Sequence, residues 1–362
     1  ILKHEEKAVF SLRSLYRKYG YTPYKMSKFE EYEYYIRNKD FLISDRIITF
    51  NDTNGKLLAL KPDVTLSIVR NGEDRAGYKQ KVCYNENIYR ISDSTGQYKE
   101  ILQTGLECIG DIDLYDIYET VSLATQSLAL ISEDFVLQIS HMGLLTAVLD
   151  SISLDAEFRR QAISFIARKD AHDLIRLCRR YEIPDEQTQL LTQLVTVYGS
   201  REAVLDKLVE QCAILAPEAM EELKSLSTLL NRMPQSERII FDFSVVNNMN
   251  YYNGIVFRGF AEGVPDSVLS GGQYDRLMRQ MGRRGGAVGF AVYLDRLGRM
   301  SAAAKEYDVD TLLLYDEGCD LTALYAAADT LRGDGSVMLQ KEIPAKLTYR
   351  QGYRFEKGEV KP

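Results

Sequence analysis

The stretch DFSVVNNMNYYNGIVF, residues 242–257, places two adjacent tyrosines, Tyr251 and Tyr252, directly before the strand-like run GIVF. Their hydroxyl groups could line the wall of a small polar pocket, because a phenol both donates and accepts hydrogen bonds. The pair could equally be a strand end with its hydroxyls in water. Ahead of it stand three neutral amides, where a binding site more often has charge: Asn247, Asn248 and Asn250.

The composition is that of a soluble protein with more than one domain. Its 362 residues exceed the usual size of one domain, and hydrophobic and charged contents of 45% and 27% are ordinary. The net charge of −7 disfavours a broad nucleic-acid-binding surface. No stretch approaches the ~18 apolar residues of a membrane helix. No signal-like start is visible in a chain that opens at Ile1 without Met.

Cysteine and histidine usage indicates a reduced protein without a metal site. The cysteines are odd in number, far apart and without a C-x-x-C pair, which favours free core thiols in the cytoplasm: Cys83, Cys108, Cys178, Cys212 and Cys319. The histidines are equally scattered, with no metal-ligand spacing: His4, His141 and His172. We therefore expect a cytoplasmic protein with no metal and no cofactor.

The first 143 residues mix helices and strands. Residues 5–19 predict an amphipathic helix that stops at Gly20. The run RIITFNDTNGKLLALK predicts a hairpin turning at Asn54-Gly55. Two further strand-like runs, QKVCYNENIYRI and EILQTGLECIG, flank a polar link long enough to fold over a ligand. A helix at 114–131 and a short buried strand at 135–140 follow.

The pattern then changes twice. Residues 144–236 are mainly helical, with breaks near Pro184, Gly199 and Pro217, so they predict a helical insertion. Strand signals return in residues 237–303, which we expect to complete the domain begun by residues 1–143. Residues 304–362 begin with a β-α-β pattern and predict a separate, short α/β segment.

Four stretches resemble the catalytic core of the class II aminoacyl-tRNA synthetases, specifically the histidyl-tRNA synthetase family. They occur in the family's order: LALKPDVTLSIVR, NIYRISDSTGQYKEILQTGLECIG, NNMNYYNGIVF and SGGQYDRLMRQMGRRGGAVGFAVYLDRL. The resemblance implies an α+β fold in which helices flank an antiparallel sheet, with a helical insertion and a dimer interface. Residues 307–362 resemble only the beginning of the family's anticodon-binding domain, so a truncated α/β segment is expected there.

The resemblance implies that the amino-acid half of the site survives. The family's histidine-binding positions fall on Asp63, Thr65, Arg90, Gln103, Glu107, Tyr251 and Tyr252. Asp63, Thr65 and Gln103 offer acceptors to an α-ammonium group. Neutral imidazole has one donor and one acceptor, which Glu107 and Tyr252 can match. The alternative is that these residues are strand positions held by packing alone.

The nucleotide half departs from the family pattern, so we expect no catalytic residues. Five positions have lost the residue that the family uses with ATP: Ser92, Asp93, Gln97, Asn247 and Tyr293. Phosphoryl and adenylyl chemistry relies on cations that neutralise developing charge, whereas Asp93 adds an anion and Tyr293 crowds the nucleotide. Arg90 and Arg296, which are general to the class, remain, and structural ion pairs are the favoured interpretation of them.

A synthetase-like chain without ATP chemistry resembles the regulatory subunits of short-form ATP phosphoribosyltransferase, the first enzyme of histidine biosynthesis. The resemblance implies assembly with the short catalytic subunit as homodimers within a hetero-oligomer. It also implies activation of that subunit and feedback inhibition by histidine. Two alternatives stay open: a divergent synthetase or free-standing amino-acid-activating enzyme, and an RNA-binding paralogue. Neither nucleic acid nor a membrane is an expected partner.

Overall fold

The computed structural model describes residues 4–38, 47–73, 75–92, 95–246, 252–297 and 307–362. The chain divides into two compact units, Ile1–Met300 and Ser301–Pro362. The four segments drawn from the sequence, 1–143, 144–236, 237–303 and 304–362, are finer than this division and stay predictions. Within the described residues, no helix has the length and apolar character needed to cross a membrane.

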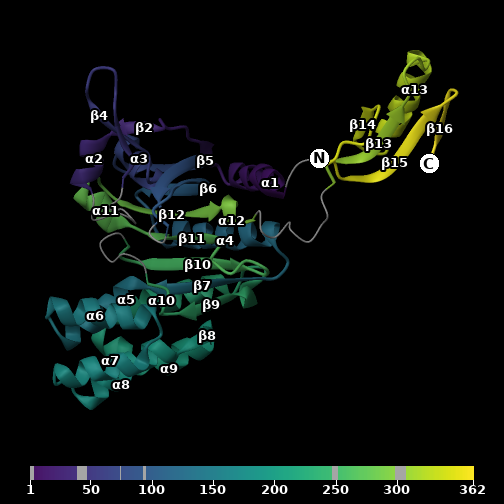
Figure 1. Ribbon diagram of the computed structural model, residues 1–362. Helices are drawn as coiled ribbons and strands as arrows, with labels where there is room; N and C mark the ends of the chain where they lie inside the picture. The colour runs from purple at the N-terminus through teal and green to yellow at the C-terminus, as the bar shows by residue number, and fades with distance from the viewer. Residues whose placement is uncertain (1–3, 39–46, 74, 93–94, 247–251, 298–306) are drawn as a thin grey trace. The chain divides into compact units, whose positions relative to one another are not determined.

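A nine-stranded sheet organises the larger unit (Figure 1). Its central strands, from β5 to β7, pair antiparallel, whereas β1 joins β5 and β9 joins β7 in parallel. This confirms the predicted antiparallel sheet. In spatial order the strands are β1 (Thr22–Pro23), β5 (Lys79–Ile91), β6 (Tyr98–Gly110), β12 (Gly286–Tyr293), β11 (Leu269–Gln273), β10 (Ile255–Ala261), β7 (Phe135–His141), β9 (Ile239–Asp242) and β8 (Tyr198–Ser200).

Two helices predicted from periodicity bury their apolar stripes in the main core. Helix α1 (His4–Lys18) buries Leu12 and Tyr16. It is followed by Gly20, whose φ of 83° suits a residue without a side chain. Helix α4 (Leu114–Ile131) packs across several strands of the sheet and has the predicted bounds. The amphipathic patterns in the sequence therefore located both helices correctly.

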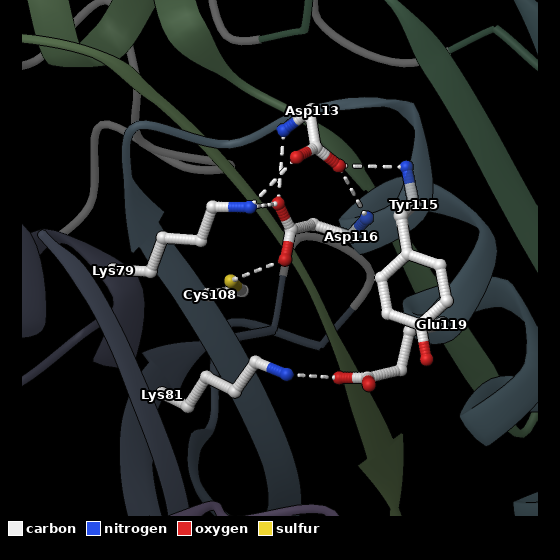
Figure 2. Close-up of polar contacts among 7 residues, drawn as sticks. All are labelled: Lys79, Lys81, Cys108, Asp113, Tyr115, Asp116 and Glu119. Atoms are coloured by element: carbon white, nitrogen blue, oxygen red, sulfur yellow. Dashed lines mark hydrogen bonds and ion pairs between the residues drawn. The ribbon is translucent and has the colours of Figure 1, made fainter. Parts of the chain in front are cut away.

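Ion pairs fasten α4 and its N-cap to strand β5 (Figure 2). Lys79 Nζ lies 2.8 Å from Asp113 and 2.6 Å from Asp116, and Lys81 pairs with the buried Glu119. Asp113 and Asp116 also form a capping box that satisfies backbone N–H groups in the first turn of α4. Asp113 and Asp116 thus cap the start of the helix and also hold it on the sheet.

The helical insertion appears as six α-helices among the described residues, with one short strand between them. They are α5 (Met142–Ile152), α6 (Ala156–Ala167), α7 (Ala171–Arg180), α8 (Asp185–Thr196), α9 (Arg201–Leu215) and α10 (Pro217–Leu230), followed by the 3-10 turn η2 (Ser236–Arg238). Pro184 immediately precedes α8, Pro217 opens α10, and Gly199 lies in β8. All three predicted breaks therefore coincide with element boundaries.

A small sheet and short helices complete this unit. The sheet is β2 (Phe29–Glu31), β4 (Leu57–Leu60) and β3 (Thr49–Asn51), in spatial order β2-β4-β3. Strands β3 and β4 form the predicted hairpin, with Gly55 at a φ of 80° in its turn. The short helices are α2 (Tyr32–Arg37), α3 (Val64–Asn71), α11 (Asp275–Gln280) and α12 (Leu294–Leu297).

The smaller unit has its own sheet and core. The predicted β-α-β pattern is present as β13 (Val309–Tyr315), α13 (Leu321–Arg332) and β14 (Val337–Gln340). Two strands that the sequence pattern did not predict, β15 (Tyr349–Glu356) and β16 (Glu359–Lys361), extend the sheet in the order β14-β13-β15-β16. Leu313, Leu324, Ala328 and Phe355 form the buried core between α13 and this sheet.

Candidate functional site: a polar cavity on the central sheet

A cavity of about 210 Å³ lies over the central strands of the large sheet. One row of paired residues crosses its floor in register: Tyr84, Gly105, Ala291, Ser270 and Arg258. Alternation along a strand puts every second residue on one face, so Gln103 and Glu107 of β6 rise from the same face as Gly105. The small residues in the middle strands leave space, and the larger polar residues surround it.

Glu107 is the central acceptor of the cavity. It is 2% exposed, and its Oε1 accepts a hydrogen bond from Thr65 Oγ1 at 2.7 Å. Its Oε2 accepts from the Tyr274 hydroxyl. Burial raises the pKa of Glu107 to about 8, against the opposing effect of these two donors. A carboxylate offers about four lone-pair sites, so Glu107 retains acceptor capacity for a ligand.

Gly289 makes room for this carboxylate. It faces Glu107 across the β6–β12 pair, and a Cβ atom built there would lie 1.7 Å from Glu107 Oε2. The same Cβ atom would lie 2.4 Å from the Leu106 backbone carbonyl oxygen, which cannot move aside as a side chain can. Glycine at position 289 is therefore required by the position of Glu107.

Asp63 and Thr65 are placed by the start of helix α3. Asp63 is its N-cap, accepting a hydrogen bond from the Leu66 backbone N–H at 3.0 Å. Arg90 lies 3.8 Å from Asp63 and donates from Nε to the Pro62 carbonyl at 3.0 Å. Burial raises the pKa of Asp63, and the Arg90 charge partly opposes this rise. The ion pair predicted for Arg90 is thus present.

Tyr252 and Gln103 also line the cavity. The Tyr252 ring meets the Tyr274 ring edge to face, with centroids 6.5 Å apart. Gly272 allows this placement, because a Cβ atom there would lie 2.7 Å from Tyr252 Cδ1. Burial raises the pKa of Tyr252 well above its ordinary value, so its hydroxyl keeps its proton and can donate.

The end of the cavity nearest Tyr293 is built from side chains that bind one another. The Tyr293 hydroxyl lies 2.6 Å from Ser270 Oγ. The Arg296 guanidinium stacks over the Tyr293 ring, 4.4 Å from its centroid, and donates to the Ser267 carbonyl. The ion pair predicted for Arg296 is wrong: in the described part of the chain it contacts the carbonyl and hydroxyl of Ser267 and an aromatic face.

Two of the predicted positions in the nucleotide half lie away from the cavity. Strands β5 and β6 pair as far as Ile91 and Tyr98, and the connecting loop is closed by Ser92 N–H bonding to the Gln97 carbonyl at 2.9 Å. Gln97 is exposed, and neither Ser92 nor Gln97 lines the cavity. Among the described residues, Ser92 and Gln97 therefore join the two strand ends.

The structure brings most of the predicted histidine-binding residues together. Six of the seven line one cavity: Asp63, Thr65, Arg90, Gln103, Glu107 and Tyr252. Tyr293, predicted to crowd a nucleotide, lines it as well. Several predicted positions lie outside the described residues: Asp93, Asn247, Asn248, Asn250 and Tyr251.

Sequence reasoning missed several lining residues: Tyr84, Arg258, Ser267, Ser270 and Tyr274. Tyr274 lies within the quoted SGGQYD segment. The signal available for it in the sequence was a tyrosine directly before a helix. Arg258 breaks the apolar run IVFRGF of β10. A charge in the middle of a central strand is costly unless it faces a polar space, so it also marked the cavity.

Among the described residues, two groups of arginines lie outside this cavity. Arg283 donates to the backbone carbonyls of Arg70 and Gly72, at the C-terminal end of α3. Arg176 and Arg180 do lie exposed on α7, near Asp173 and Gln161. In the described residues all five cysteines are free, and no group of His, Cys, Asp and Glu is arranged to hold a metal ion.

Comparison with known proteins gives one family and relatives that share one name. The family model described as histidyl-tRNA synthetase matches residues 2–297. A relative from Caldanaerobacter subterraneus subsp. tengcongensis, named ATP phosphoribosyltransferase regulatory subunit, is 29% identical over 90% of this chain and 87% of its own. One from Clostridium kluyveri with the same name is 27% identical over 90% of this chain and 86% of its own.

Solved structures share the fold. The ATP phosphoribosyltransferase regulatory subunit/histidyl-tRNA synthetase from Bacillus halodurans has a TM-score of 0.78 and 22% identity, covering 97% of this chain and 93% of that one. A chain of the ATP phosphoribosyl transferase (HisG:HisZ) complex from Thermotoga maritima has a TM-score of 0.64 and 20% identity, covering 80% of this chain and 97% of that one. These likenesses confirm the predicted class II synthetase-like fold.

Proposed function

This chain belongs to the histidyl-tRNA synthetase family, and from that premise we propose that it is a regulatory subunit rather than an amino-acid-activating enzyme. In this proposal it assembles, as a homodimer within a hetero-oligomer, with the short catalytic subunit of ATP phosphoribosyltransferase. It activates that subunit and carries its feedback inhibition by histidine. Relatives with the regulatory-subunit name, similar along 90% of the chain, support this choice.

The observation that carries the proposal is the contrast within one cavity. Acceptors suited to an ammonium group and to an imidazole N–H gather around Asp63, Thr65 and Glu107. At the other end Tyr293 fills space and is bonded to Ser270 and stacked on Arg296.

Feedback follows if histidine binds one state of the complex better than the other. A coupling free energy of ~1–3 kcal/mol between the histidine site and the catalytic subunit would change activity by roughly 5–150-fold. A site that hydrogen-bonds both ring nitrogens is also selective, because a ligand without them leaves buried polar groups unpaired. We place the complex in the cytoplasm, where the free thiols of the described residues would stay reduced.

Reconstitution with the short catalytic subunit tests this proposal. The chain alone should show no phosphoribosyltransferase activity, whereas the mixture should be faster than the catalytic subunit alone and sensitive to histidine. Glu107→Ala should lose the histidine sensitivity, and Glu100→Ala, an exposed position on the same strand, should keep it. A catalytic subunit that is fully active and equally inhibited by histidine without this chain would refute the role.

An amino-acid-activating enzyme is the second candidate, favoured by the family model that spans residues 2–297. Robust ATP–pyrophosphate exchange in the presence of histidine would establish it and overturn our proposal. We expect no exchange, because cations that stabilise the transferring group are what the nucleotide half lacks.

A further inference from the structure

Lys61 is a fully buried lysine at the point where the small sheet leads into the cavity. It directly follows β4 and precedes Pro62 and Asp63, and Asp63 lines the cavity. Its side chain is 0% exposed, and its Nζ donates a hydrogen bond to Glu86 Oε2 on β5 at 2.8 Å. Burial of an ammonium group is costly unless the group is paired, so Lys61 depends on Glu86.

The pair of Lys61 and Glu86 joins two parts of the chain that carry acceptors for an ammonium group. On one side, the Lys61 N–H donates to the Lys28 carbonyl at 3.0 Å, and the Lys61 carbonyl accepts from the Tyr89 N–H at 2.9 Å. On the other side, Glu86 is paired with Gln103 across β5 and β6. Directly paired residues point to the same face of a sheet. The pair therefore connects the segment ahead of α3 to the strands that carry Gln103.

A stiff link carries the position of Lys61 to the acceptors. Only Pro62 separates Lys61 from Asp63, and proline restricts both its own backbone and that of the residue before it. Asp63 is the N-cap of α3, and Thr65 in the first turn of this helix donates to Glu107 Oε1 at 2.7 Å. A displacement of Lys61 would thus move Asp63 and Thr65 as well.

Stability alone is a weak reason for a charged pair at this place. Desolvation of two buried charges offsets much of their attraction, and apolar residues of similar volume are often equally stable. An apolar pair, however, lacks a hydrogen bond of defined direction between the segment ahead of α3 and β5. The charged pair therefore differs from an apolar pair in the position that it imposes on this segment.

We propose that Lys61, acting through Glu86, is a positioning residue that holds Asp63 and Gln103 toward the ammonium group of the amino acid bound in the cavity. The proposal rests on the function proposed above. Lys61 itself does not line the cavity, so its effect on a ligand passes through the acceptors that do.

Two ligands and a small set of variants test this role. Histidine carries the ammonium group, whereas imidazolepropionic acid has the same ring and a carboxylate without it. Each ligand is titrated calorimetrically into the full chain as wild type, Lys61→Met/Glu86→Leu and Lys61→Arg, and denaturant melts give the stability of each variant. Lys81→Met/Glu119→Leu is the matched control, because this ion pair also starts on β5 but holds α4.

We expect wild type to bind histidine more tightly than imidazolepropionic acid. Lys61→Met/Glu86→Leu should be about as stable as wild type. It should bind histidine about tenfold more weakly, the usual effect of losing one hydrogen bond to a charged group. Its affinity for imidazolepropionic acid should match that of wild type, because this ligand has no ammonium group to place. Lys61→Arg, which keeps the charge, should retain most of the histidine affinity, and the control should bind both ligands as wild type does.

An unchanged ratio of histidine to imidazolepropionic acid affinity in Lys61→Met/Glu86→Leu would overturn the positioning role and leave the pocket intact. Equal affinity of wild type for the two ligands would also overturn it, because the ammonium group would then not be recognised. If the double variant does not fold, Glu86→Asp, which keeps the charge but shortens the side chain, decides by the same ratio. A wild-type chain that binds neither ligand would refute the proposed pocket itself, and the positioning role with it.

Discussion

The two ends of the cavity use hydrogen bonds in opposite ways. At the β6 end, Thr65 and Tyr274 donate to Glu107 and hold its carboxylate toward the cavity with acceptor capacity remaining. At the other end, Tyr293 and Arg296 contact one another, and their polar atoms bond to Ser270 and Ser267. The first arrangement prepares groups for a ligand, and the second satisfies groups internally. In the function that we propose, internal pairing takes the place of a ligand at the second end while the fold is kept.

The sharpest test of the acceptor end is the pH dependence of stability. Burial raises the pKa of Glu107 from 4.5 to about 8. Below about pH 4.5 the carboxyl is protonated in both states. As pH rises toward 8 the unfolded chain loses this proton first, so the free energy of unfolding falls, by roughly 5 kcal/mol at most.

Glu107→Gln removes this ionisation. We expect denaturant melts to show the variant more stable than wild type at pH 9, with the advantage disappearing toward pH 4.5. A stability difference that does not change with pH would show that the Glu107 carboxyl is not held neutral by its surroundings.

Removal of the carboxyl should abolish histidine recognition. Histidine at a hundredfold excess over its Kd should stabilise the wild-type chain by ~2.7 kcal/mol, seen as a shift of a few degrees in Tm. Glu107→Ala removes the acceptor for the imidazole N–H and leaves the hydroxyls of Thr65 and Tyr274 without this partner, so affinity falls at least about tenfold. Differential scanning calorimetry measures the Tm shift caused by histidine in the wild type and in Glu107→Ala. A shift that survives undiminished in Glu107→Ala would move the site elsewhere.

Tyr252→Phe should have a smaller effect than Glu107→Ala. The phenyl ring keeps the edge-to-face contact with Tyr274, and only a hydroxyl is lost. A neutral hydrogen bond contributes ~0.5–1.5 kcal/mol, so histidine affinity should fall by a few-fold. The Tm shifts caused by histidine in Tyr252→Phe and in Glu107→Ala, measured side by side, show which residue contributes more to histidine binding. A larger loss for Tyr252→Phe would reverse the roles that we assign to them.

The smallest effect is expected where the nucleotide end is repaired. Asn247→Arg restores one charge, but Tyr293 still occupies its place against Ser270 and Arg296. Groups that act on one transition state are not additive, so one repair should recover little. ATP–pyrophosphate exchange with histidine should stay at background. Measurable exchange would show that the nucleotide end can still use ATP, contrary to the difference that we infer between the two ends.

Local patterns predicted most of the fold. The α4 bounds and the β3–β4 hairpin follow from apolar spacing and an Asn-Gly turn, both of which act over a few residues. Strands β15 and β16 were missed because the charged residues in RQGYRFEKGEV hide the alternation on which such predictions depend.

The site was predicted where a motif covered it and missed where the register between strands decided it. Glu107 and Thr65 follow from the family resemblance. Tyr274 bonds to Glu107 from 167 residues further along the chain, and Arg258 reaches the floor only through pairing with β11. The internal bonding of Tyr293 with Ser270 is likewise invisible in sequence, because it depends on how β12 and β11 align.

Strand β6 carries a last consequence for how a ligand is received. Its residues alternate, so Gln103 and Glu107 face the cavity while Leu106 and Cys108 are fully buried in the main core. Turning Glu107 toward a ligand by moving the strand would also displace core side chains, and close-packed interiors resist this. The ligand that we propose would thus lose little affinity to rearrangement of this strand.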